Sequence, residues 1–533
     1  MENQAWILAV FVVYFSVIIG LALWFRKSKN LADYFLGGRK LNTWVGALSA
    51  QTSDMSGWLL MGLPGAIYAA GTGRAWIAVG LIIGTVLNWC FVAKRLRRST
   101  IVFSNSITLP EYLENRFHDK SHVLKLTAAV FFAIFFTVYA TSGFVAGGTL
   151  LPQIFDISYQ TALIIIAAFV VGYTLIGGLM AISWTDSIQG MMMLLAGFFL
   201  PIIVISQMGG WANVSAEVPA GWFNIMQVGG NPIRWQSMLS DLAWGLGYFG
   251  MPHILIKLIA IKRERNVNKS AIIAIVWVVL ALFSAVMVGI VGRAFVPGLA
   301  GVEETAFINM IRMIFLDHGA LWATLLGGLF LCGMFAAIKS TADSQLLVAS
   351  SALSDIYRQA NKKASDKHLV WISRGAVLVV AIVALIFALS AYDPALGGPN
   401  RNRGVMVLVA MAWAGFGAAF GPLVLCSLFW KRTNKIGAIL GIAVGGLVVI
   451  FWQYIPLLQG YINNEPALVP LSAPLLETVT TGARGGTGIF SIIPGFVLSL
   501  AAIIIGSLAT KKPSEAVLEE FAAAQQPLVE DDD

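Results

Sequence analysis

Three polar stretches interrupt segments of this chain that are otherwise apolar. The first is the run SAQTSDMSGW at 49–58, which surrounds one carboxylate, Asp54, with five hydroxyl or amide side chains. Unpaired polar groups are costly in the middle of a membrane helix, so the run predicts a break. Freed carbonyls there can hold a cation, and the next half-helix can present N–H groups to an anion. The alternative is that the hydroxyls bond to their own helix and that Asp54 pairs with a buried neighbour.

The second stretch is DLAWGLGYFGMPH at 241–253, in which three glycines and a proline accompany Trp244 and Tyr248. Such a sequence predicts another irregular helix. Interrupted helices at corresponding places in two halves of a chain indicate an inverted-repeat transporter with a binding site near the bilayer midplane. The alternative is that the glycines only permit close helix packing.

The third stretch is AAIKSTADSQ at 336–345. Helical spacing places four residues on one face: Ala337, Ser340, Thr341 and Ser344. Carbonyl and hydroxyl oxygens on that face suit a small hard cation such as sodium. Lys339 and Asp343 stand four residues apart, so they can neutralise each other, and a purely structural ion pair remains the alternative.

The composition requires that these stretches be positioned by a membrane bundle. Of 533 residues, 58% are apolar or aromatic and only 12% are charged, which excludes an ordinary soluble protein of this size. One span needs roughly 20 apolar residues, so the chain is long enough for about a dozen. The net charge of +8 does not indicate nucleic acid, because basic loops between spans produce the same excess.

Hydropathy predicts an all-α polytopic membrane protein with about 13 spans: 5–25, 42–71, 75–93, 123–151, 160–181, 184–208, 235–261, 270–295, 319–356, 368–392, 404–430, 436–456 and 487–510. Most of the 35 lysine and arginine residues fall on one side if the N-terminus is outside and the C-terminus inside. The first span has no cleavage site, which fits a multi-pass protein of the inner (plasma) membrane. Residues 1–510 then form one transporter domain, and the polar tail 511–533 is expected to be solvated and cytoplasmic.

The chain resembles the sodium:solute symporter family over about residues 5–510. The matching stretches are SDMSGWLLMGLPGA at 53–66, LPEY at 109–112, SWTD at 183–186, WGLGYFGMPH at 244–253, STADSQLLV at 340–348 and AWAGFGAAFGP at 412–422. The resemblance implies a leucine-transporter-like architecture with inverted five-helix repeats at about 42–208 and 235–430. Helices 5–25, 436–456 and 487–510 would be additions to this core.

The resemblance also implies a function: uptake of L-proline coupled to sodium by alternating access, with no catalysis and no cofactor other than the coupling ion. The implied sodium ligands are the backbone of Thr52 and Met55, the carbonyl of Ala337 and the hydroxyls of Ser340 and Thr341. The implied proline pocket comprises Ser56, Trp58, Gly62, Tyr139, Trp244, Tyr248 and Pro252. Coupling is implied for Asp54 and Ser56, and Asp186 matches a position that in some relatives forms a second sodium site with hydroxyls such as Ser344.

One departure from the family pattern concerns Lys339, which replaces an apolar methionine, and Asp343, which replaces a hydroxyl. The ammonium either takes the place of sodium or pairs with Asp343 or Asp186 and leaves sodium binding intact. The alternatives within transport are therefore proton-coupled or sodium-independent movement of proline or another small amino acid or carboxylate. A membrane sensor would need a C-terminal signalling domain, and an enzyme would need convergent catalytic groups, whereas Lys339 and Ser340 are only adjacent. The expected partners are proline, sodium and lipid, not nucleic acid.

Overall fold

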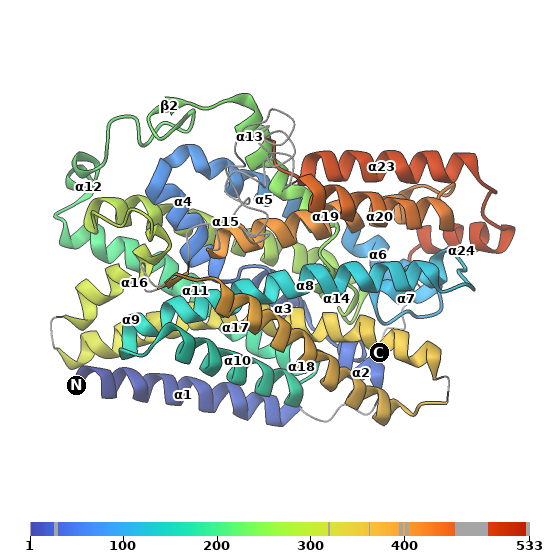
Figure 1. Cartoon of the computed structure of the whole chain (residues 1–533), viewed down its shortest axis with the longest axis horizontal. Helices are drawn as coiled ribbons and strands as arrows, with labels where there is room; N and C mark the ends of the chain where they lie inside the picture. The colour runs from blue at the N-terminus through green and yellow to red at the C-terminus, as the bar shows by residue number, and fades with distance from the viewer. Residues whose placement is uncertain are drawn as a thin grey trace.

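A computed structural model of the chain describes residues 2–25, 30–317, 320–361, 363–393, 398–399, 404–452 and 489–528. Its helices run side by side along the longest axis of the molecule (Figure 1). The long helices are α1 (Glu2–Phe25), α8 (Val123–Leu150), α10 (Tyr159–Ile176), α11 (Leu179–Gln207), α15 (Glu264–Phe295), α17 (Leu321–Ala360), α18 (Asp366–Ser390), α19 (Val405–Phe429), α20 (Lys435–Trp452) and α23 (Ile492–Ala509).

The second and seventh predicted spans are interrupted, as the sequence predicts. The second consists of α3 (Thr43–Thr52) and, after a break, a π-helical turn (Trp58–Gly62) that continues into α4 (Leu63–Ala70). The seventh consists of α13 (Trp235–Leu242), a 3₁₀ segment (Ala243–Phe249) and α14 (Pro252–Ile259), with a bend of 45° before Pro252.

Helices occupy all thirteen predicted ranges within the described residues. Eleven of the described helices are long and apolar enough to cross a membrane, or twelve if the bent pair Trp235–Phe249 and Pro252–Ile259 is one span. The number of spans, the orientation and the repeat boundaries stay predictions. Positions 453–456 and 487–488 of two predicted spans lie outside the described residues.

One further span and several short elements complete the described chain. A continuous span over Thr72–Val102 contains a 3₁₀ turn (Thr72–Ala75), α5 (Trp76–Leu87), a π-helical turn (Asn88–Val92) and α6 (Ala93–Val102). The other short helices are α2 (Leu31–Leu36), Gly37–Arg39, α7 (Leu109–Arg116), α9 (Pro152–Phe155), α12 (Trp211–Glu217), Glu303–Thr305, α16 (Ala306–Ile311), Arg312–Leu316 and α24 (Glu515–Gln525). Two antiparallel pairs join β1 (Gln227–Val228) to β2 (Asn231–Pro232) and β3 (Tyr392–Asp393) to β4 (Gly398–Pro399).

Helices α19 and α17 lie at the centre of the bundle. The apolar stretch of α19 is wholly enclosed by protein and that of α17 is mostly enclosed, whereas only about a third or less of the apolar stretches of α1, α18 and α23 is buried. Exposed apolar side chains on a bundle of this composition are suited to lipid. The polar residues of α17 are therefore positioned by protein contacts on all sides.

The two interrupted helices are joined at one end by the backbone. The N–H of Leu41, just before α3, donates to the Ala260 carbonyl at 3.1 Å, and the Lys262 N–H donates back to the Leu41 carbonyl at 2.8 Å. The Arg39 guanidinium donates to the Ile259 carbonyl at 2.8 Å. Burial and the neighbouring Arg97 lower the pKa of Arg39 to about 10, so the guanidinium remains charged at neutral pH. These contacts fix α14 against the start of α3.

Glycines allow the 3₁₀ segment to lie directly on α5. A Cβ added at Gly84 would stand 2.3 Å from the Gly245 carbonyl oxygen, and one added at Gly80 would stand 2.3 Å from the Leu242 carbonyl oxygen. Both obstacles are backbone atoms, so they cannot rotate away. The close approach of the interrupted helix to α5 therefore depends on residues without side chains.

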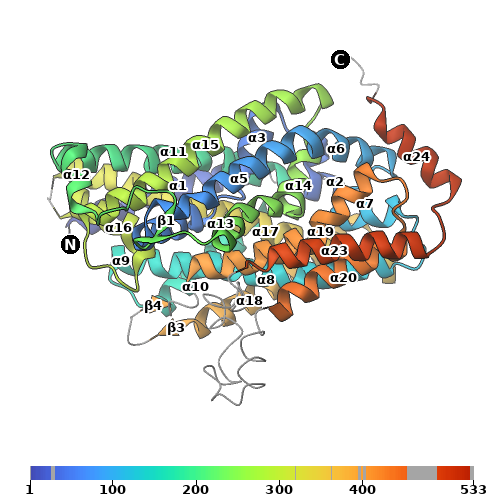
Figure 2. The ribbon, with the colours of Figure 1, turned by 90° about the horizontal axis from the view of Figure 1, so that it is seen from above.

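The expectation of a fully solvated tail is wrong for residues 515–525, which form α24 (Figure 2). Three apolar residues at helical spacing, Val517, Phe521 and Ala524, give this helix an inward face, with Val517 and Ala524 buried. The Arg116 guanidinium lies 4.8 Å from the centre of the Phe521 ring, and Arg98 donates to the Gln525 carbonyl at 3.1 Å. The acidic end at 529–533 lies outside the described residues.

The contact between α5 and the 3₁₀ segment generates a stability prediction. We expect Gly84→Ala to force the two backbones apart and to destabilise the fold by about 1–3 kcal/mol, the usual cost of overpacking. The measurement is the apparent melting temperature of the purified protein in detergent. Gly172→Ala in α10 is the matched control, since a Cβ there meets no described atom within 4 Å. Equal melting temperatures for both variants would contradict the prediction.

Candidate functional site

The break after α3 is built from side chains and backbone of the polar run itself. The N–H groups of Asp54 and Met55 both donate to the Gln51 carbonyl, at 3.1 and 3.0 Å, which closes the end of α3. The indole N–H of Trp58 then turns back to the Asp54 carbonyl at 3.0 Å. The chain thus makes a compact turn within the second predicted span. The polar side chains of this turn are enclosed by protein.

The carboxylate of Asp54 connects the two interrupted helices. Asp54 is fully buried, and its Oδ2 accepts a hydrogen bond of 2.5 Å from the Tyr248 hydroxyl in the 3₁₀ segment. Its second oxygen, Oδ1, is buried and has no hydrogen-bond partner among the described residues. A buried carboxylate oxygen without a partner is unusual, so it marks a place where a ligand can bind.

Four aromatic side chains gather next to this carboxylate: Trp58, Trp244, Tyr248 and Trp413. The Trp244 ring centre lies 6.4 Å from that of Trp58 and 6.5 Å from that of Trp413, and Tyr248 meets Trp413 edge to face at 5.2 Å. The Trp413 indole N–H donates to the Trp244 carbonyl at 2.7 Å. We refer to these four residues as the aromatic cluster.

Trp413 was not predicted as a site residue. It belongs to the stretch AWAGFGAAFGP in α19, which marks the family resemblance but contains no polar break. Its place depends on Gly247, since a Cβ there would lie 2.1 Å from Trp413 Nε1. The sequence contained two signals for this contact: Trp413 stands among small residues, and Gly247 lies in a distant segment that also contains site residues.

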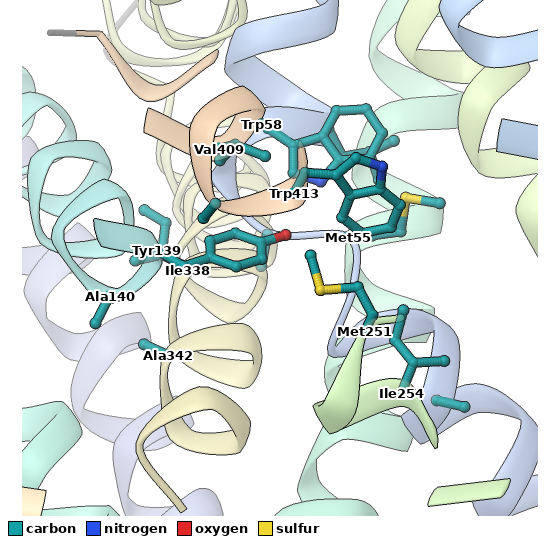
Figure 3. Packing of buried hydrophobic residues seen from close by; sticks show 14 of the residues in the cluster. Met55, Trp58, Tyr139, Ala140, Met251, Ile254, Ile338, Ala342, Val409 and Trp413 are labelled. Atoms are coloured by element: carbon teal, nitrogen blue, oxygen red, sulfur yellow. The ribbon is translucent and has the colours of Figure 1, made fainter. Parts of the chain in front are cut away.

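Tyr139 reaches the same region from α8. Figure 3 shows its ring pointing toward Met55, with Trp58 and Trp413 on one side and Met251 on the other. The side chain is fully buried, and its hydroxyl has no hydrogen-bond partner within the part of the chain that the structure describes. Tyr139 therefore brings a second unpartnered polar atom to the break.

The three other predicted pocket residues have different surroundings. The Ser56 hydroxyl accepts a long hydrogen bond of 3.4 Å from the Trp58 N–H, within the break. Pro252 is buried and begins α14 directly after the bend. Gly62 lies one turn beyond Trp58 and faces Met406 of α19, whose atoms would be 3.2 Å from an added Cβ. The structure thus places Ser56 at the break and Pro252 at the bend, whereas Gly62 supports the packing of α19.

The predicted cation ligands come together between α3 and α17. The Ser340 hydroxyl lies 3.3 Å from the Thr52 carbonyl oxygen and 3.2 Å from the Ala337 carbonyl oxygen. The neighbouring Thr341 hydroxyl is buried without a hydrogen-bond partner among the described residues. Met55 is fully buried within the break, three residues after Thr52. Oxygen atoms of these types are the ligands that a hard cation prefers.

Lys339 and Asp343 form the ion pair that their spacing predicts. Lys339 Nζ lies 2.5 Å from Asp343 Oδ2, and neither side chain is exposed. The ammonium also donates to the Thr185 hydroxyl at 3.2 Å and lies 3.3 Å from the centre of the Tyr173 ring. The ammonium is therefore directed toward α10 and α11, whereas the Ser340 hydroxyl is directed toward α3.

Asp186 is paired with a residue that the sequence did not single out. Its Oδ2 lies 2.5 Å from Lys257 Nζ in α14 and accepts a hydrogen bond of 2.9 Å from the Ser49 hydroxyl. The Lys257 ammonium also donates to the Ser344 hydroxyl at 2.9 Å. The structure thus brings the predicted residues Asp186 and Ser344 together, with an ammonium between them.

A model of the sodium:solute symporter family matches residues 34–445. The chain belongs to this family. It is similar to the sodium/proline symporter of Escherichia coli (strain K12), with 41% identity over 530 residues, 97% of this chain and 96% of the relative. It is also similar to the high-affinity proline transporter PutP of Bacillus subtilis (strain 168), with 41% identity over 505 residues, 93% and 96% of the two chains. These relatives are named as transporters, not as enzymes.

Solved structures share the fold of this family member. A sodium-coupled sialic acid symporter, in a substrate-bound outward-open state, superimposes with a TM-score of 0.74 at 19% identity over 96% of this chain and 99% of its own. An Eremococcus coleocola manganese transporter superimposes with a TM-score of 0.51 at 15% identity, covering 88% and 96%. The expected leucine-transporter-like, all-α architecture is confirmed, and with it a multi-pass integral membrane protein.

The Lys339–Asp343 pair generates a second prediction. We expect Lys339→Met to strand a buried carboxylate, at a cost of about 3–5 kcal/mol, and to lower the yield of folded protein. Adding Asp343→Ser removes the stranded charge and should restore the yield. Size-exclusion chromatography of the solubilised variants measures both effects. A single variant that folds as well as the parent would show that the pair does not stabilise the protein.

Proposed function

We propose that this symporter carries L-proline together with sodium across a bacterial plasma membrane by alternating access. The observation that carries the proposal is a pair of polar atoms without hydrogen-bond partners among the described residues, Asp54 Oδ1 and the Tyr139 hydroxyl, buried beside the aromatic cluster at an interrupted membrane helix. The family and the names of the relatives support both the solute and the ion.

The chemistry of proline suits these side chains. Its pyrrolidine ring is compact and apolar, so it gains from contact with Trp and Tyr faces, as ligands in aromatic pockets generally do. Its secondary ammonium is a cation with two N–H donors, for which Asp54 Oδ1 is a charged acceptor. Its carboxylate suits the start of the half-helix Trp58–Ala70, where the helix dipole is positive.

Sodium suits the oxygen set between α3 and α17. The ion would be held by the carbonyls of Thr52 and Ala337 and by the hydroxyls of Ser340 and Thr341. The backbone of Met55, in the break, would contribute a further ligand. The fit is supported by the buried Thr341 hydroxyl, which has no partner in the described part of the chain and would gain one from a bound cation. Because Thr52 precedes Asp54 by two residues, ion binding would order the turn that presents the carboxylate to proline, which is a direct route to coupling.

A second candidate is proton-coupled transport, favoured by the fully buried pair of Lys339 and Asp343. A proton gradient would then drive proline uptake without sodium. The two candidates share the fold and the proline pocket, and they differ only in the ion.

Uptake of radiolabelled proline into proteoliposomes tests the proposal. We expect accumulation when sodium is higher outside, and no accumulation when choline replaces it at constant pH. A proton gradient alone should be ineffective. Uptake that follows the proton gradient and ignores sodium would favour the second candidate, and failure to accumulate proline under every gradient would contradict both.

Trp244 is the test of the pocket. We expect Trp244→Ala to raise the half-saturation constant for proline by at least tenfold, or about 1.4 kcal/mol, because the ring stacks in the aromatic cluster. Trp322→Ala is the matched control, since that side chain is 70% exposed. A constant within twofold of the parent value would remove Trp244 from the site.

Thr341 is the test of the ion site. We expect Thr341→Ala to raise the sodium concentration for half-maximal uptake by at least tenfold, with a much smaller effect on the rate at saturating sodium, because one ion ligand is lost. Thr127→Ala serves as the control, because that hydroxyl bonds to the Val123 carbonyl of its own helix. Unchanged sodium activation would place the ion elsewhere.

A further inference from the structure

The Lys257 ammonium has the surroundings of a bound cation rather than those of a simple pair. Its Nζ contacts a carboxylate oxygen of Asp186 at 2.5 Å, the Ser344 hydroxyl at 2.9 Å and the Ser49 carbonyl oxygen at 3.1 Å. These oxygens come from α11, α17 and α3, whereas Lys257 itself comes from α14. The side chains of Lys257 and Asp186 are both completely buried.

This oxygen set lies one helical turn from the proposed sodium ligands. On α3, Ser49 precedes Thr52 by three residues, and on α17, Ser344 follows Ser340 by four. Three or four residues of helix rise about 4.5–6 Å, so the two oxygen sets are stacked between the same two helices. Each set combines a backbone carbonyl of α3 with a hydroxyl of α17. They differ in that the set around Lys257 contains a carboxylate and is filled by an ammonium from within the chain.

The charges around Lys257 balance without an additional ion. Lys339 and Asp343 interact electrostatically with the Lys257–Asp186 pair, and the four groups carry two positive and two negative charges. A sodium ion added to the oxygens around Lys257 would have to share them with an ammonium that already lies 2.5–3.1 Å from each. The ammonium therefore excludes a free cation from its own oxygen ligands.

We propose that Lys257 supplies a tethered cation to a second cation site between α3, α11 and α17. The transporter then binds one free sodium ion, at the neighbouring site proposed around Thr52 and Ser340. The proposal rests on the proposed function. It assigns to this chain a latent sodium site that becomes available when the ammonium is removed. An ordinary structural ion pair has no such property, because its stranded carboxylate would only destabilise the fold.

Sodium binding to Lys257→Met tests the proposal. We expect the Hill coefficient for sodium activation of proline uptake to be about 1 in the parent and about 2 in the variant. We also expect the apparent melting temperature of the purified variant to rise more than that of the parent when sodium chloride replaces choline chloride at equal concentration, because a second ion then stabilises the folded state. Lys257→Gln, which loses the charge but keeps N–H donors, provides the same comparison if Lys257→Met is not recovered.

Two controls isolate the oxygen site. Lys125→Met breaks another buried pair, Lys125 Nζ to Glu114 Oε2 at 2.8 Å, and should leave the sodium response as in the parent. Lys257→Met combined with Asp186→Asn removes the charged ligand and should lose the added response.

Several results would overturn the proposal. These are a parent Hill coefficient near 2, or a neutral variant with the parent's Hill coefficient and the parent's sodium-dependent melting shift. The melting experiment needs no proline, so it separates failure of this inference from failure of the proposed function, which would appear as a parent that neither binds nor accumulates proline.

Discussion

The hydrogen bond from Tyr248 to Asp54 is the contact on which the site depends. It joins two interrupted helices that are far apart in the sequence. It also completes a closed ring of contacts among five residues. Tyr248 meets Trp413, Trp413 bonds to the Trp244 carbonyl, Trp244 lies beside Trp58, and Trp58 returns to the Asp54 carbonyl. Interrupted helices expose backbone groups that lipid cannot satisfy, so each break needs support from protein, and here the two breaks support each other.

Buried charge is organised around the same breaks. The pairs Lys257–Asp186 and Lys339–Asp343 tie α14 to α11 and close one turn of α17. Replacing both members of such pairs by apolar residues is often neutral or stabilising, so stability alone does not explain their presence. The contacts of Lys257 with oxygens of three different helices are the basis of its proposed role in setting the number of bound sodium ions.

Local spacing accounts for what the sequence predicted well. The polar run at 49–58 and the glycines of 241–253 predicted both interruptions, and the four-residue separation of Lys339 and Asp343 predicted their pairing. Lys257 was missed because its partner Asp186 is 71 residues away and no local pattern links them. The tail helix was not predicted, although the spacing of Val517, Phe521 and Ala524 describes an apolar face.

The glycine contact between α5 and the 3₁₀ segment also limits how the molecule can move. Backbone faces backbone at Gly80, Gly84 and Gly245, so sliding one segment along the other would drive carbonyl oxygens into Cα atoms. The two segments can therefore slide along each other only if their backbones first separate. The 45° bend before Pro252 separates the segment packed on α5 from α14, which is fastened to the start of α3 by the backbone bridge at Leu41. The bend therefore lies between two parts of one interrupted helix that are fastened to different neighbours.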